Sequence, residues 1–177
     1  MTDTVEFARS IDVTDLEEGD RLDEKIAADE SERHSLAQRF DVDAIISLEA
    51  AVIISRRGRQ VVVDGLFAVD LRQTCVITLE PIETRIDEEL HVVFDPDVRP
   101  SGEFDETIDL NVGSEDPPEP MVDERFDLGE AVAERLGLAI DPYPRKPGAV
   151  LDERYTDKES LEPANPFEAL KSLKFDT

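Results

Sequence analysis

The side chains best suited to metal or thiol chemistry are one cysteine, Cys75, and two histidines, His34 and His91, which lie far apart in the sequence. A tetrahedral zinc site needs four nitrogen or sulfur ligands, usually in closely spaced pairs. One thiolate and two scattered imidazoles do not supply that set. We therefore expect Cys75 to be a buried structural residue and the protein to bind no metal and no other cofactor.

The sequence also lacks the motifs of nucleophilic and phosphate chemistry: it has no G-x-S-x-G, no glycine-rich phosphate loop and no H-E-x-x-H. Carboxylates are abundant, but acid–base catalysis requires paired carboxylates whose surroundings move their pKa values apart. We expect these acids to form a solvated surface and the protein not to be an enzyme. The alternative, a hydrolase that uses acidic residues, would need a concave cluster of convergent carboxylates.

Basic side chains are concentrated at Arg56, Arg57 and Arg59, on an expected hairpin tip. Guanidinium groups bind phosphate well, so this tip is a candidate RNA contact. The alternative is a solvated turn whose charges protect a sheet edge, and the lack of interleaved aromatic residues favours it. Arg145 and Lys146 form a second, smaller basic spot, which could join the first only if the fold brings the two together.

The overall charge is strongly negative. The 177 residues include 44 acidic and 19 basic side chains, which gives a formal net charge of -25. Such a charge repels RNA phosphates and anionic membranes and attracts basic proteins, although it could also be a solubility trait alone. A single cysteine fits a reducing compartment, and neither a signal peptide nor a membrane-spanning run is evident, so we expect a cytoplasmic location.

The elements that position these residues are mainly strands, because apolar residues alternate with polar ones over several stretches. We predict strands over residues 5–11, 22–26, 44–55, 60–71 and 84–94. Gly65, inside the fourth stretch, marks either a bulge or a close approach of two backbones.

Two helices are expected to pack on these strands. The first is predicted to begin at Ser31 as N-cap and to end near Phe40. The second is predicted to begin at Asp127, with Glu130 completing a capping box, and to end near Leu136. Prolines prevent it from continuing further.

Together these elements predict one α+β domain over residues 1–145. It holds a curved, mainly antiparallel sheet packed by two short helices, and the strand at 5–11 either completes an open sheet or closes it into a barrel-like form. An acidic flexible loop is expected at about 95–126, with a short edge strand at 108–112. The polar tail, 146–177, is expected to end in a short amphipathic helix that packs on its own domain or docks on a partner. The apolar residues of this helix are Phe167, Leu170 and Leu173.

Three segments carry a resemblance to a known family: QTCVITLEP at 73–81, DLGE at 127–130 leading to DPYPR at 141–145, and NPFEALKSLK at 165–174. In this order and spacing they resemble the bacterial YceD family, the large ribosomal RNA subunit accumulation proteins. The signature positions are Cys75, Leu79, Pro81, Asp127, Leu128, Pro144, Asn165, Pro166 and Phe167. The resemblance covers most of the chain from about residue 29 onward.

The resemblance implies a non-enzymatic factor in ribosome biogenesis that supports accumulation or processing of large-subunit ribosomal RNA. Many relatives carry paired cysteines where this chain has only Cys75, so no cysteine-based role is carried over. The acidity fits binding to a basic ribosomal protein, or to RNA at one focal site such as the arginine tip; neither a membrane nor a small-molecule substrate is expected. The alternative is an acidic protein-interaction module unrelated to ribosomes.

Overall fold

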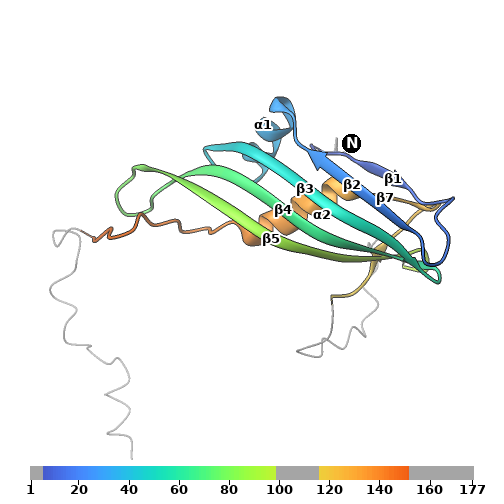
Figure 1. The fold of residues 1–177 in the computed structure, drawn as a ribbon. Helices are drawn as coiled ribbons and strands as arrows, with labels where there is room; N and C mark the ends of the chain where they lie inside the picture. Colours follow the sequence, from blue (N-terminus) through green and yellow to red (C-terminus); the bar gives the residue numbers. More distant parts are fainter. Residues whose placement is uncertain (1–5, 99–115, 152–177) are drawn as a thin grey trace, which may run out of the picture.

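The computed structural model describes residues 6–98 and 116–151, which form two sheets and two helices (Figure 1). The elements in chain order are β1 (Ser10–Asp12), β2 (Arg21–Ala27), α1 (Glu30–Arg39), β3 (Ala44–Arg57), β4 (Gln60–Thr74), β5 (Pro81–Asp95), β6 (Glu119–Pro120), β7 (Arg125–Asp127) and α2 (Leu128–Ala139). The predicted α+β class is confirmed. None of the described helices has the length and apolar character needed to cross a membrane.

The main sheet has five strands in the order β2-β3-β4-β5-β6. Its first four strands are antiparallel neighbours, whereas β6 pairs in parallel with the end of β5. The alternating pattern therefore located the central strands correctly. In the described residues the sheet is open, so the structure has the open form of the two that the sequence allowed.

The predicted N-terminal strand at 5–11 is corrected by the structure. Only Ser10–Asp12 forms a strand, and it pairs with β7 in a separate two-stranded sheet. The preceding backbone is bound to the start of α2, because Leu128 N–H donates to the Arg9 carbonyl at 2.9 Å. Phe7 is buried at the same place. The segment therefore does not extend the main sheet.

One face of the main sheet forms the core and is covered by the helices; α2 lies across it behind β4 and β5 in Figure 1. Alternate residues of the long strands face this core, as the period of two requires. Each fully buried Leu, Ile, Val or Phe side chain contributes about 1.5–3 kcal/mol relative to an exposed one. The buried residues include Leu48, Val52 and Ile54 of β3, Val63, Phe67 and Val69 of β4, Leu90, Val92 and Phe94 of β5, and Leu36, Val132 and Leu136 of the helices.

Gly65 lies where two backbones approach closely, as one of its two interpretations predicted. A Cβ at this position would lie 2.3 Å from the Ala51 carbonyl oxygen and 2.6 Å from the Val52 Cα. The register irregularity that marks a bulge occurs instead on β3, between Ile45 and Ser47. Only glycine fits this point of the sheet without a backbone shift.

Helix α1 begins earlier than predicted. Its N-cap is Asp29, whose carboxylate accepts from the Glu32 backbone N–H at 2.9 Å, while the Glu32 carboxylate accepts from the Asp29 N–H at 2.8 Å. The Ser31 hydroxyl donates to Asp29 instead of capping the helix. The predicted cap was wrong because a carboxylate two residues upstream satisfies the free N–H groups.

Helix α2 begins after Asp127 as predicted. The Asp127 carboxylate accepts hydrogen bonds from the backbone N–H groups of Gly129 and Glu130. The expected capping box is only half formed: the Glu130 carboxylate pairs with Arg39 of α1 at 2.7 Å. Of the acidic loop predicted at about 95–126, Asp95 ends β5, 119–120 form β6, and 125–126 belong to β7. The predicted strand at 108–112 and the predicted terminal helix lie outside the described residues.

Candidate functional site

The β4–β5 turn is organised around Cys75, which is fully buried. Cys75 N–H donates to the Glu80 carbonyl and Leu79 N–H donates to the Cys75 carbonyl, both at 2.9 Å. The sulfur accepts two further backbone N–H groups, from Thr78 at 3.4 Å and from Lys146 at 3.3 Å. One side chain thus holds the turn and a distant segment together.

The backbone N–H of Lys146, followed by the side chain and then the backbone N–H of Thr78, lowers the pKa of the Cys75 thiol to about 6. These donors favour the thiolate, which is a stronger hydrogen-bond acceptor than the thiol. Within the described residues there is no group of three or more His, Cys, Asp or Glu side chains that could hold a metal ion. The sulfur accepts hydrogen bonds from residues of both segments, and its role in this geometry is that of an anchor.

The segment anchored by Cys75 is the second family-like stretch. Val76 N–H donates to the Pro144 carbonyl at 3.0 Å, and the buried Gln73 side chain donates to the Asp141 carbonyl at 2.9 Å. Residues of two sequence signatures, about seventy positions apart, therefore lie side by side. The sequence showed that both are present but not that they touch.

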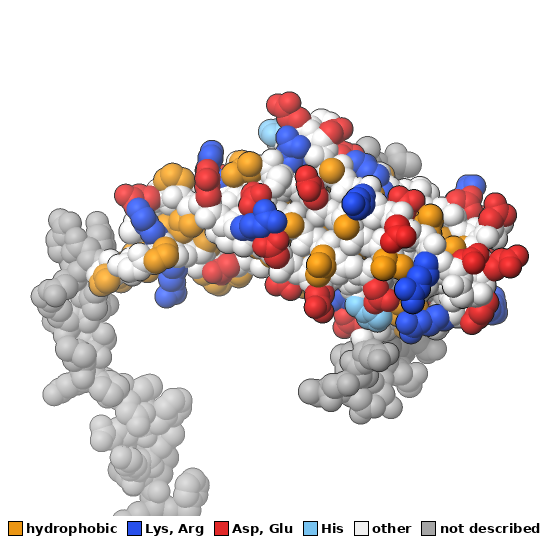
Figure 2. All heavy atoms as spheres, in the orientation of Figure 1, with side chains coloured by type: hydrophobic (Ala, Val, Ile, Leu, Met, Phe, Trp, Pro, Cys, Tyr) orange, Lys and Arg blue, Asp and Glu red, His pale blue; other side chains and the backbone are white. Residues whose placement is uncertain are grey.

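Hydrophobic side chains project from this junction into solvent. We call Val76, Leu79 and Tyr143 the signature patch; Leu79 is 76% exposed and Tyr143 69% exposed. Figure 2 shows hydrophobic side chains gathered at this end of the molecule, on the left. Clustered exposed apolar groups are typical of contact surfaces.

Leu79 adds backbone strain to this exposure. Its φ of 58° is left-handed, a conformation that costs an ordinary residue about 1–2 kcal/mol. Glycine would relieve the strain, and the leucine side chain makes little buried contact in return. A strained and exposed side chain at a turn points to a role in contact rather than in stability.

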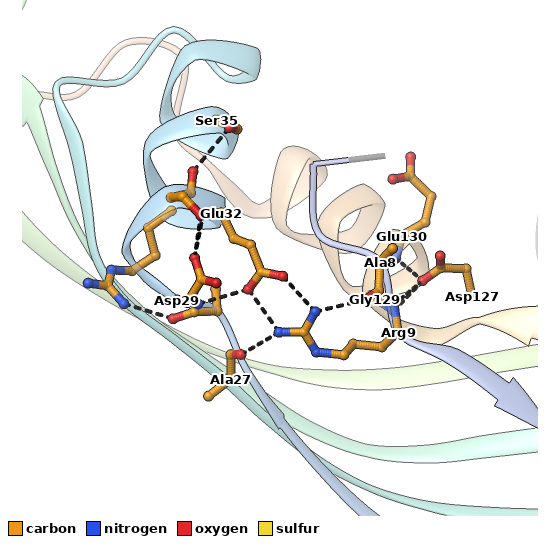
Figure 3. Close-up of polar contacts among 12 residues, drawn as sticks. Ala8, Arg9, Ala27, Asp29, Glu32, Ser35, Asp127, Gly129 and Glu130 are labelled. Atoms are coloured by element: carbon orange, nitrogen blue, oxygen red, sulfur yellow. Dashed lines mark hydrogen bonds and ion pairs between the residues drawn. The ribbon is translucent and has the colours of Figure 1, made fainter. Parts of the chain in front are cut away.

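Arg9 forms a second polar centre, shown in Figure 3. Its guanidinium pairs with Glu32 of α1 at 2.6 Å and donates to the Ala27 carbonyl of β2 at 2.8 Å. Its backbone N–H donates to the Asp127 carboxylate at 2.8 Å. The Arg9 hydrogen bond lowers the pKa of Glu32. One arginine therefore joins β2, α1 and the N-cap of α2, and sequence periodicity gave no signal for it.

The residues of the DLGE signature have structural roles at this centre. Asp127 caps α2, and Leu128 is fully buried. Only glycine fits at position 129, because a Cβ there would lie 2.0 Å from the Phe7 carbonyl oxygen. Glu130 pairs with Arg39. This signature therefore builds the attachment of the N-terminal segment to α2.

The three arginines near the β3–β4 turn have different surroundings. The Arg56 side chain is 14% exposed, pairs with Glu124 and donates to the Val13 carbonyl. Arg59 is exposed and pairs with Asp97 at 2.8 Å. Arg57 is exposed and has no ion pair among the described residues. The structure therefore does not present the three as one basic surface.

The second basic spot lies at the other end of β4. Arg145 is exposed, and Lys146 pairs with Glu80 at 2.6 Å. Because β4 has 15 residues, roughly 45–50 Å separate the two turns along the strand. The fold does not bring the two basic spots together. Phe167, Leu170 and Leu173, with Asn165 and Pro166, lie outside the described residues.

The chain forms an α+β domain, and two of the three segments singled out in the sequence build the β4–β5 turn and the start of α2. The family model described as "Large ribosomal RNA subunit accumulation protein YceD" matches residues 63–174. The chain belongs to this family. No curated protein and no solved structure matches the chain.

Proposed function

We propose that this protein is a non-enzymatic factor in biogenesis of the large ribosomal subunit, and that it supports accumulation of the ribosomal RNA by binding a basic ribosomal protein. The family description supports the general role. The choice of a protein partner over RNA is supported by the distribution of charge.

The observation that supports this choice most is that two of the three arginines at the β3–β4 turn already have partners, in a chain with a net charge of -25. Arg56 is engaged inside the domain and Arg59 is paired with an acid. A focal RNA contact at this tip would have to rely mainly on Arg57, against the repulsion between phosphates and the rest of the molecule. A basic protein would be attracted by the same field, and association would be faster at low salt.

Acidic groups also crowd one another beside α2. Partial burial raises the pKa of Glu119, and the neighbouring charges of Glu134 and Asp116 add to the shift. A cationic side chain brought to this surface would relieve like-charge repulsion. The signature patch offers apolar contact area at the end of the sheet where the β4–β5 turn lies.

Sedimentation of a cell lysate through sucrose tests the general role. The tagged protein is expected to comigrate with large-subunit precursors at low salt and to leave them as the salt concentration rises. If it stays in the light fractions at every salt concentration, the proposal fails.

Direct titrations test the class of partner. Individually purified basic large-subunit proteins are expected to bind more tightly than a large-subunit ribosomal RNA transcript, with affinity that falls as salt rises. The Arg57→Ala variant is the matched control, and its affinity for the basic protein is expected to equal or slightly exceed that of the wild type. Tighter binding of RNA, lost on Arg57→Ala, would overturn the choice of partner.

A further inference from the structure

Strand β5 has a long unpaired side in the described part of the chain. It pairs with β4 along its whole length, but β6 pairs with its other side only at Phe94 and Asp95. No described strand pairs with that side over residues 81–93. In Figure 1, β5 runs along the margin of the sheet.

Two hydrogen bonds show which backbone groups face this free side. The Asp95 carbonyl accepts from the Met121 N–H at 3.2 Å, and the His91 carbonyl accepts from the Arg135 guanidinium at 3.2 Å. Strand residues alternate in the direction of their N–H and C=O groups. The same side is therefore faced by the N–H and C=O groups of Glu83, Arg85, Asp87 and Glu89.

The side chains of these outward-facing residues make the edge acidic. They lie on the sheet face opposite the core, since Leu90, Val92 and Phe94 face the core. Arg85 is the one base among them and is paired with Asp87 and Asp70, and Glu83 is paired with Arg72 of β4. Glu89 is exposed and has no ion pair among the described residues.

The opposite edge of the sheet differs in charge. Arg21 and Lys25 of β2 lie on the open face of the sheet, with Asp23 between them. A basic strand would be repelled by these side chains, and the Ala27 carbonyl is already bound by Arg9. Charge therefore distinguishes β5 as the edge that suits a basic strand.

We propose that an extended basic segment of the protein partner adds to the free edge of β5 as a further strand. This inference rests on the proposed function and names the contact that would carry it. The outward N–H and C=O groups supply main-chain hydrogen bonds, and Lys or Arg side chains at alternate positions of the added strand lie opposite the outward acids, above all the exposed Glu89. The apolar side chains between these Lys or Arg residues of the added strand lie on the other face, beside Ile86 at the margin of the core. The same acids oppose edge-to-edge pairing of two copies of this chain.

Amide hydrogen exchange on the wild-type protein tests the contact without any mutation. The probe is a peptide of alternating Lys and Val residues, and its control has the same charge with prolines in place of some valines. On saturation with the first peptide, the amides of Glu83, Arg85, Asp87 and Glu89 are expected to exchange at least about tenfold more slowly. The proline peptide, which cannot form a continuous strand, is expected to leave them unchanged.

Three outcomes of this experiment would overturn the inference. These amides could be protected already in the free protein, which would mean that the edge is occupied. Both peptides could bind equally well, which would mean that charge alone attracts them. A single-stranded RNA oligonucleotide could protect the same amides more strongly than the alternating peptide does.

A pair of variants separates the backbone contact from the charge. Glu89→Pro removes the charge and the outward N–H at a free edge, where proline is tolerated. Glu89→Ala removes the charge and keeps the N–H. We expect Glu89→Pro to weaken binding of the alternating peptide at least about tenfold relative to Glu89→Ala. Equal affinities of the two variants would contradict strand addition. If Glu89→Pro does not fold, the exchange pattern of the wild type decides.

Sedimentation of the same variants distinguishes this inference from the proposed function. If the wild type and Glu89→Pro both comigrate with large-subunit precursors, the β5 contact is overturned and the function stands. If Glu89→Pro no longer comigrates with the precursors and Glu89→Ala still does, both the proposed function and the β5 contact are supported. If the wild type does not comigrate, the proposed function fails whatever the peptide does.

Discussion

Replacing Gly129 with alanine tests the attachment of the N-terminal segment to α2. The new Cβ would lie 2.0 Å from the Phe7 carbonyl oxygen, whereas real Cβ contacts below 3.0 Å essentially never occur. The Phe7 backbone must therefore move by about 1 Å or more. That movement stretches the bonds from Arg9 N–H to Asp127 and from Leu128 N–H to the Arg9 carbonyl, which are now 2.8 and 2.9 Å long.

The destabilisation can be bounded from these contacts. If the segment shifts but stays, overpacking costs about 1–3 kcal/mol and each weakened hydrogen bond about 0.5–1.5 kcal/mol. If the segment detaches, the loss of the buried Phe7 ring costs about 3–5 kcal/mol. Alanine in place of glycine in a helix returns up to about 1 kcal/mol. We therefore expect a net loss of about 1–6 kcal/mol, or roughly 2–24 °C in the melting temperature.

Urea and thermal unfolding, followed by circular dichroism, measure this change. Gly137→Ala is the matched control, since it is the same exchange in the same helix. Its Cβ would lie 3.1 Å from the edge of the Phe40 ring, a partly exposed side chain that can shift. We expect its stability to stay within about 1 kcal/mol of the wild type. If Gly129→Ala unfolds with the wild type, the close approach to Phe7 and the structural role of DLGE are refuted.

Three further predictions concern other parts of the site. Cys75→Ser is expected to change how stability depends on pH. The fold lowers the thiol pKa from its usual 9.0 to about 6, so the wild type gains stability as pH rises between these values and loses it as pH falls. Urea titrations of the variant at several pH values should lack this rise. Arg56→Ala should cost about 1–2 kcal/mol in urea unfolding, because it leaves a partly buried ion pair without its cation, whereas Arg57→Ala should change stability by less than about 0.5 kcal/mol; equal effects would contradict the different surroundings of the two arginines. Leu79→Gly should leave stability within about 1 kcal/mol, because relief of the left-handed backbone offsets the greater chain entropy of glycine, and should weaken comigration with large-subunit precursors if the signature patch is a contact; a large loss of stability would show that Leu79 is structural.

The sequence predicted the central sheet well because the period-two alternation of β4 and β5 extends over many residues. It predicted Asp127 as a cap, and it offered a close approach as one of two interpretations of Gly65, because both signals are local. The start of α1 was misplaced by the competition between Ser31 and Asp29, two residues that are both good caps.

The failures concern contacts between distant residues. The N-terminal strand was assigned to the main sheet because alternation predicts a strand but not its neighbour. Arg56, Arg57 and Arg59 look alike in sequence, but their partners come from loops that only the fold brings near. Arg9 and the free side of β5 were missed because neither ion pairing nor strand order is encoded in local patterns.

The attachment of Arg9 to Asp127 also has a consequence for the order of folding. The two residues are 118 positions apart, whereas β2, β3, β4 and β5 pair with their neighbours along the chain. During synthesis the meander from β2 to β5 can form while α2 has not yet left the ribosome. Phe7 and Arg9 must wait for α2, so closing this long loop is expected to be a late step. Until then, Phe7 and Arg9 lack their native partners although the whole meander follows them in the chain.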